Sequence, residues 1–153
     1  MVEIIAYEMQ FGGKVANETD IKLELFRDEF YPEYEKVYNE CFIEMRKALD
    51  IKPYNFYSAI EELDDKRKNI YVLWRRNTIV GSVACYGNEI DDLIVNKNYQ
   101  NKGVGRQLLF WAIKYIRNNN NESIVLHVAK WNEKALKLYL NSGFEINKIE
   151  KIR

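Results

Sequence analysis

The segment that decides the fold is QNKGVGR, residues 100–106. It follows an apolar, strand-like run, Leu93–Val95, and opens a predicted helix. Its two glycines, separated by one residue, let the backbone come close to a ligand. The free N–H groups of a helix start attract anions, and Lys102 and Arg106 add positive charge nearby. The segment therefore predicts a site for a phosphate or a pyrophosphate.

The segment does not match the common nucleotide-binding motifs. The GK[ST] ending of a P-loop is absent, and Leu108 stands where a dinucleotide fingerprint requires its third glycine. The preceding strand also belongs to a predicted meander rather than to a βαβ unit. Taken alone, the segment is equally well explained by a tight strand-to-helix turn that needs glycine.

Hydrophobic spacing predicts regular elements on both sides of this segment. Strands are expected at 2–11, 21–26, 69–75, 79–86, 89–95, 123–128 and 144–152, and helices at 32–49, 58–65, 103–117 and 132–141. In the strand 21–26, Ile21, Leu23 and Leu25 are expected on one face, and Ser58 with Glu61 has the spacing of a capping box. The order predicts an α/β (mixed α+β) fold, with a mixed, mostly antiparallel sheet and helices on both faces.

Composition excludes several classes of function. The 153 residues suit one domain, and 23 basic against 23 acidic residues give zero net charge, which argues against a nucleic-acid or membrane partner. Cys41 and Cys85 form no CxxC or Cys/His pattern, so no metal site is expected, and His127, the single histidine, is interpreted as structural. No signal peptide is visible at the start of the sequence, which predicts a cytoplasmic protein.

Two motifs together resemble the GNAT superfamily of N-acetyltransferases. QNKGVG is similar to the family's Q/R-x-x-G-x-G/A motif. Residues 132–144 are similar to its second signature, N-x-x-A-x-x-L-Y-x-x-x-G-F, which follows a strand that includes Leu126. The resemblance covers about residues 21–150, in motifs after residue 70 and only in element order before it. It implies one acetyltransferase domain over residues 1–153, with 1–12 as an additional N-terminal strand.

The resemblance implies acetyl-CoA as cosubstrate and no metal. In the family, two neighbouring strands splay apart and the pantetheine arm enters between them; here these are Leu93–Val95 and Ser123–Val128. A backbone N–H near Val95 would polarise the thioester carbonyl. The expected cofactor-binding residues are Leu93, Ile94, Val95, Gln100, Asn101, Lys102, Gly103, Val104, Gly105, Arg106, Asn132 and Tyr139.

The same resemblance suggests catalytic roles. Tyr139 matches the family's tyrosine, whose phenol protonates the departing thiolate. Glu89 and Asp91 are the candidate bases; strand alternation places them on one face with Leu93 and places Asp92 on the other, unless a bulge changes the parity. Water relays also serve as bases in this family, so neither carboxylate is required.

The acceptor is expected to be a primary amine of a small molecule or peptide. Aromatic residues at 30–31 and 52–57, followed by acidic residues at 61–65, would suit an amine through cation–π contacts. For each residue taken singly, helix packing and a solvated acidic face are the favoured explanation. Two alternatives stay open: a non-catalytic CoA- or peptide-binding module, and an interaction domain without a CoA site.

The C-terminus departs from the family pattern. Typical members have one more strand after the Gly-Phe strand, whereas this chain ends at Arg153. We expect the N-terminal run Val2–Phe11 to fill that place in the sheet, either in its own chain or in a partner subunit of a homodimer, because the sheet would otherwise have an open edge.

Overall fold

The computed structural model describes residues 2–13 and 18–153, which form a seven-stranded sheet and three α-helices. The strands are β1 (Ile5–Phe11), β2 (Glu24–Leu25), β3 (Ile70–Arg75), β4 (Thr78–Tyr86), β5 (Glu89–Val95), β6 (Val125–Ala129) and β7 (Phe144–Lys151). The helices are α1 (Tyr31–Ala48), α2 (Val104–Asn119) and α3 (Glu133–Asn141), with 3₁₀ turns η1 (Asp28–Phe30), η2 (Ile60–Leu63), η3 (Arg67–Asn69) and η4 (Lys97–Tyr99). Within the described ranges, no helix combines the length and the apolar composition needed to span a membrane.

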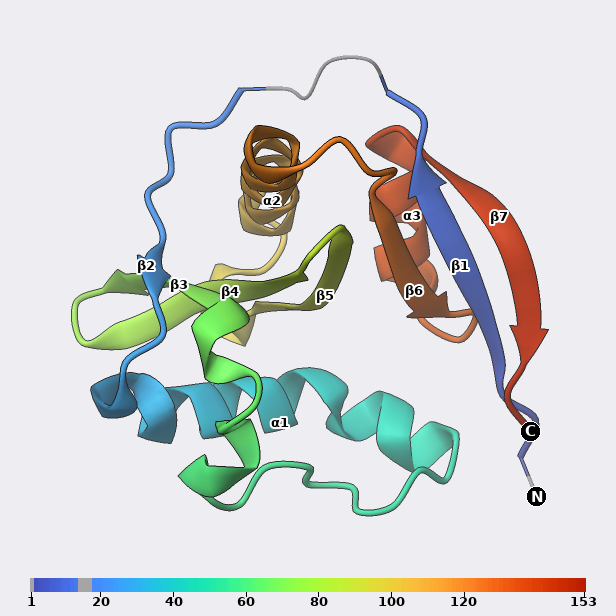
Figure 1. Cartoon of the computed structure of the whole chain (residues 1–153). Coiled ribbons are helices and arrows are strands. Elements are labelled where there is room, and N and C mark those ends of the chain that lie inside the picture. Colours follow the sequence, from blue (N-terminus) through green and yellow to red (C-terminus); the bar gives the residue numbers. More distant parts are fainter. Residues whose placement is uncertain (1, 14–17) are drawn as a thin grey trace.

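The sheet is mixed and mostly antiparallel, as predicted. Its order is β2-β3-β4-β5-β6-β1-β7, and β5 and β6 form its parallel pair (Figure 1). Residues of α1 pack with β3 and β4 in one core, whereas α2 and α3 pack with β1, β4 and β6 in another. The helices therefore cover both faces, α1 on one side and α2 with α3 on the other.

The N-terminal strand lies inside the sheet of its own chain. β1 pairs antiparallel with β6 on one side and with β7 on the other (Figure 1). Met9 and Phe11 point from β1 into the core beneath α2 and α3, and Met9 is fully buried. Of the two alternatives for the N-terminal run, the structure thus shows the one within the same chain, and β7 depends on β1 for its backbone pairing.

Truncation of Met9 tests how much the fold depends on this strand. We expect Met9→Ala to lower the free energy of unfolding by about 2–5 kcal/mol, because the substitution leaves a cavity in a fully packed core. Gln10→Ala is the matched control, since the side chain of Gln10 points to the opposite face of β1. Denaturant unfolding measures both; equal stability of Met9→Ala and wild type would contradict a structural role for β1.

Two local predictions are wrong in detail. The predicted strand 21–26 is regular only at β2, where Leu25 is 49% exposed and Phe26 is buried instead. The reason is that β2 is a short edge strand after which the chain turns into η1 and α1. The predicted helix at 58–65 is the 3₁₀ turn η2, and Glu62, rather than Glu61, accepts hydrogen bonds from the backbone N–H groups of Ser58 and Ala59.

Candidate active site

The loop between β5 and α2 is stabilised by hydrogen bonds from its side chains to backbone groups. Asn96 donates a hydrogen bond to the Ile79 carbonyl and accepts one from the N–H of Asn98. Gln100 Nε2 donates to the Val95 carbonyl at 3.0 Å. The first residue of the glycine motif therefore fixes the loop against the end of β5, and its predicted contact with a cofactor stays a prediction.

The N-terminus of α2 is open to a ligand. Gly103 is the N-cap with φ of 83°, a left-handed conformation that favours glycine, and no side chain caps the helix. A Cβ at Gly105 would meet Leu138 Cδ2 and Val95 Cγ2 at 3.6 Å, which is an ordinary contact. The left-handed backbone conformation therefore explains Gly103, whereas neither backbone conformation nor packing explains Gly105. A ligand that approaches the first turn closely would explain the second glycine.

The splay predicted between two strands is present in the backbone pairing. β5 and β6 pair only at Glu89 with Val125 and at Ile90 with Leu126, and beyond these residues the strands diverge (Figure 1). A cavity of about 770 Å³ lies beside the free end of β5 and is lined by that end, by α1, by the loop 99–106 and by residues around the start of α3. This volume is in the range of small-molecule and cofactor sites.

The cavity gathers most of the predicted site residues. Those that line it are Leu93, Ile94, Val95, Gln100, Asn101, Gly103, Val104, Gly105, Arg106, Asn132 and Tyr139. Lys102, Glu89 and Asp91 do not; the Lys102 ammonium lies over the Tyr99 ring, 5.8 Å from its centroid. From α1 the cavity is lined by Cys41, Phe42, Glu44 and Met45, which the sequence did not single out.

Tyr139 and Asn132 come to the cavity from the two ends of α3. Asn132 is the N-cap, and its side chain accepts a hydrogen bond from the Ala135 N–H at 3.3 Å. Tyr139 is buried and packs against the Phe144 ring. Burial, and after it the negative charge of Asp91, raises the pKa of the Tyr139 phenol well above its usual range. The phenol is therefore protonated at neutral pH, and the raised pKa also makes it a weaker acid than a free tyrosine.

A β-bulge in β5 changes the predicted orientation of the acidic residues. Ser82 pairs with Ile94 and Ala84 pairs with Asp91, so that Asp92 and Leu93 together oppose the single residue Val83. Asp92 has φ of 49° at this bulge. As a result, Asp92 faces α1 together with its neighbours Glu89 and Asp91, whereas Leu93 packs on the α2 side.

The predicted parity was therefore wrong, and the residue that it set aside is the most perturbed carboxylate. Asp92 is largely buried and accepts a hydrogen bond from the Tyr38 hydroxyl at 3.0 Å. Burial first, and then the charge of Asp91, raises the pKa of Asp92 to about 6, although Tyr38 and Lys66 act in the opposite direction. The Glu-x-Asp-Asp sequence is compatible with Asp92 on either face of β5, and the bulge turns it toward α1.

The aromatic residues expected to bind the acceptor are mostly part of the core. Phe30, Tyr31 and Tyr57 are buried, and Tyr57 packs on Tyr38 with ring centroids 4.6 Å apart. The acidic side chains at positions 61, 62, 64 and 65 are exposed and line no part of the cavity. Asp92 and Asp91 of β5 add negative charge beside the aromatic cluster, ahead of Glu62, at Tyr57.

The two cysteines are not activated nucleophiles. Cys41 lines the cavity and donates to the Val95 carbonyl at 3.2 Å, and burial raises the pKa of its thiol to about 11. Cys85 lies in the core, and burial raises its pKa to about 12. Because the thiolate is the reactive form, neither thiol is suited to form a covalent intermediate at neutral pH.

Solved structures share this fold at low sequence identity. A GNAT-family acetyltransferase from Novosphingobium aromaticivorans matches with a TM-score of 0.69 and 16% identity, over 96% of this chain and 61% of that one. One from Colwellia psychrerythraea gives 0.72 and 14%, over 97% and 55%. The PaiA N-acetyltransferase from Thermoplasma acidophilum, solved with coenzyme A, gives 0.60 and 16%, over 83% and 91%. The chain thus spans about half to three-fifths of the length of the first two relatives.

A family model gives the assignment that these distant structures cannot give alone. No curated protein sequence matches the chain significantly. The model of the acetyltransferase (GNAT) family, however, matches residues 23–144, which include the bulged strand, the glycine loop and Tyr139. The chain therefore belongs to the GNAT family of acetyltransferases.

Proposed function

We propose that the protein transfers the acetyl group of acetyl-CoA to a primary amine of a small molecule or peptide, by direct attack within a ternary complex. The observation that carries the proposal is the cavity at the β5/β6 splay, which joins an uncapped helix N-terminus to a buried, protonated phenol. Holding both substrates in one cavity would itself supply much of the rate.

The residues around the cavity fit the parts of acetyl-CoA. The N–H groups of the first turn of α2 would bind the pyrophosphate, with Lys102 and Arg106 adding positive charge. The unpaired backbone of β5 and β6 would accept the pantetheine arm, and Asn132 would hold its amides. The cosubstrate supplies an acetyl group activated as a thioester.

Three groups of the chain would handle the protons and the developing charge. A carboxylate at the β5 bulge, Asp92 in first place, would take the proton of the amine through water as the C–N bond forms, because neither Asp92 nor its acidic neighbours Glu89 and Asp91 line the cavity. A backbone N–H near Val95 would stabilise the charge on the carbonyl oxygen. Tyr139 would donate its proton to the thiolate as the C–S bond breaks. The protonated state of Cys41 supports direct transfer over an acyl-cysteine route.

Two assays on the same protein separate this proposal from its alternatives. Thermal unfolding with acetyl-CoA reports binding, because a ligand of the folded state raises the melting temperature. Thiol release with a broad panel of amines reports transfer. Binding without thiol release would favour a non-catalytic module, and no thermal shift at millimolar acetyl-CoA would favour an interaction domain without a CoA site.

Asp92→Asn tests the assignment of the base. We expect kcat/KM at pH 7.5 to fall about 100-fold and its acid limb, with an apparent pKa near 6 in the wild type, to disappear. Glu89→Gln and Asp91→Asn, measured in the same way, assign the base among the three carboxylates. Asp64→Asn, at an exposed carboxylate away from the cavity, is the control. An unchanged pH profile in Asp92→Asn would contradict the assignment.

Asp92→Asn should also change the free energy of unfolding, and the pKa of Asp92 determines the direction of that change. Because folding raises the pKa of Asp92 to about 6, its ionisation destabilises the folded state, and the penalty grows as pH rises from about 4 to 6. Above pH 7 the penalty is at most about 3 kcal/mol. Asp92→Asn should therefore be more stable than wild type at pH 8 and equally stable at pH 4. A variant that is destabilised at pH 8 would indicate a purely structural carboxylate.

A further inference from the structure

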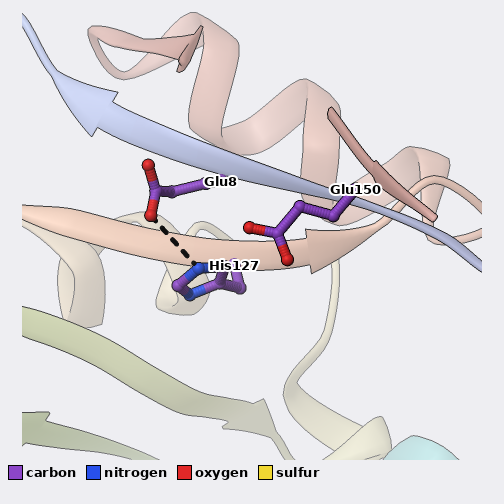
Figure 2. Close-up of side chains that lie close together, drawn as sticks. All are labelled: Glu8, His127 and Glu150. Atoms are coloured by element: carbon purple, nitrogen blue, oxygen red, sulfur yellow. Dashed lines mark ion pairs between the residues drawn. The ribbon is translucent and has the colours of Figure 1, made fainter. Parts of the chain in front are cut away.

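A second polar cluster lies on the sheet face opposite α2 and α3. Glu8 of β1, His127 of β6 and Glu150 of β7 turn toward one another from three adjacent strands (Figure 2). One ligand atom from each residue lies within 4.8 Å of the other two. Glu8 and His127 are directly opposed in the β1/β6 register. None of these three residues lines the cavity at the splay.

The two nitrogens of His127 have different surroundings. Nδ1 is 3.1 Å from Glu89 Oε2, which is a hydrogen-bond distance, whereas Nε2 is 3.5 Å from Glu8 Oε1. The second distance is long for a hydrogen bond. It matches the separation of about 3.3–3.6 Å between two ligands of a tetrahedral zinc ion with bonds of about 2.0–2.2 Å. Glu89 thus occupies the place of a carboxylate that orients a metal-ligating histidine.

Glu8 is oriented in the same way. Its Oε2 accepts a hydrogen bond from Asn147 Nδ2 at 2.9 Å, which leaves Oε1 to face His127. Lys148 pairs with the cluster: its ammonium is 3.6 Å from Glu150 Oε1, and its side chain is 65% exposed. A loose, exposed pair of this kind is weak. Three carboxylates therefore surround one imidazole with little opposing charge.

We propose that Glu8, His127 and Glu150 bind one divalent transition-metal ion of the Zn²⁺ class, with water in the remaining position. An imidazole nitrogen beside carboxylate oxygens selects such ions over Mg²⁺ and Ca²⁺. The ion would link β6, β1 and β7, and so would fasten the N-terminal strand. No sequence pattern predicts this metal site, because Glu8 and Glu150 lie at opposite ends of the chain.

The test uses the full chain without a histidine tag, so that His127 is the sole imidazole. Calorimetric titration with ZnCl₂ should give one ion per chain, while MgCl₂ gives no binding. In NMR spectra the Nε2 resonance of His127 should shift on titration while Nδ1 stays protonated. This readout needs no substitution and distinguishes the imidazole from Cys41 and Cys85. Acetyl-CoA is absent throughout, so the result is independent of the proposed transfer reaction.

Substitutions then assign the ligands. Zn²⁺ affinity should be lost in His127→Gln and should fall at least tenfold in Glu8→Gln, Glu150→Gln and Glu89→Gln. Glu145→Gln, on β7 but outside the cluster, should bind as wild type does. An unshifted imidazole resonance, or undiminished affinity in His127→Gln, would show that the cluster holds cross-strand ion pairs only. Equal binding of Mg²⁺ would overturn the assignment to transition metals.

Discussion

Tyr139→Phe should lower turnover by about 100- to 1,000-fold while the affinity for acetyl-CoA stays near that of the wild type. The phenol is buried at the cavity and protonated, and general acid catalysis of this kind contributes about 10²–10⁴-fold. Phenylalanine keeps the ring that packs against Phe144. Steady-state kinetics and acetyl-CoA titration measure the two quantities separately.

The control for this variant is the same substitution at Tyr7, a tyrosine that also packs against the core. Tyr7 of β1 packs against the same core without lining the cavity, so Tyr7→Phe should leave both turnover and affinity unchanged. A Tyr139→Phe enzyme with wild-type turnover would remove the phenol from the mechanism. A variant that lost acetyl-CoA affinity in proportion to turnover would assign Tyr139 to binding instead.

Gly105→Val should weaken acetyl-CoA binding by about 100-fold. The branched side chain would occupy the space in front of the first turn of α2, where the pyrophosphate is proposed to meet the backbone N–H groups. Hydrogen bonds to charged groups contribute about 1.5–3 kcal/mol each. If the valine side chain prevents two such bonds at the lower end of this range, the loss is about 3 kcal/mol, which corresponds to the expected fall in affinity of about 100-fold. Calorimetry measures the affinity, and thermal unfolding without ligand shows whether the variant folds.

Gly105→Ala is the matched control, because its Cβ would make only ordinary contacts at 3.6 Å. It should bind acetyl-CoA within a few-fold of the wild type, in agreement with a motif that admits alanine at this position. If Gly105→Val folds and binds normally, the ligand does not approach this turn. If both variants fail to fold, the glycine serves packing, and the argument for a phosphate cradle at this position falls.

Local sequence patterns predict much of the fold. The glycine loop, its preceding strand and the signature at 132–144 are contiguous segments, and their chemistry is determined by residues close in sequence. For that reason Gly103, Asn132 and Tyr139 all lie at the predicted cavity.

Features that depend on pairing between distant segments were not predictable in the same way. The bulge at Asp92 arises from the register of β4 against β5, and strict alternation therefore placed Leu93, rather than Asp92, on the face of Glu89 and Asp91. β1 was equally compatible with its own sheet and with that of a partner, because pairing leaves no local signature. The cluster around His127 forms only because three distant strands lie side by side in the sheet, and the spacing of residues in the sequence does not predict that arrangement.

Acetyl transfer to an amine is tested by identification of the product. The wild-type protein is incubated with acetyl-CoA and the most active amine of the panel, and the mixture is analysed by mass spectrometry, with Tyr139→Phe in parallel. We expect an amine that carries one acetyl group, formed in equal amount to free CoA and reduced at least 100-fold in the variant. Acetyl-CoA that binds tightly yet leaves every amine of the panel unmodified would contradict the account.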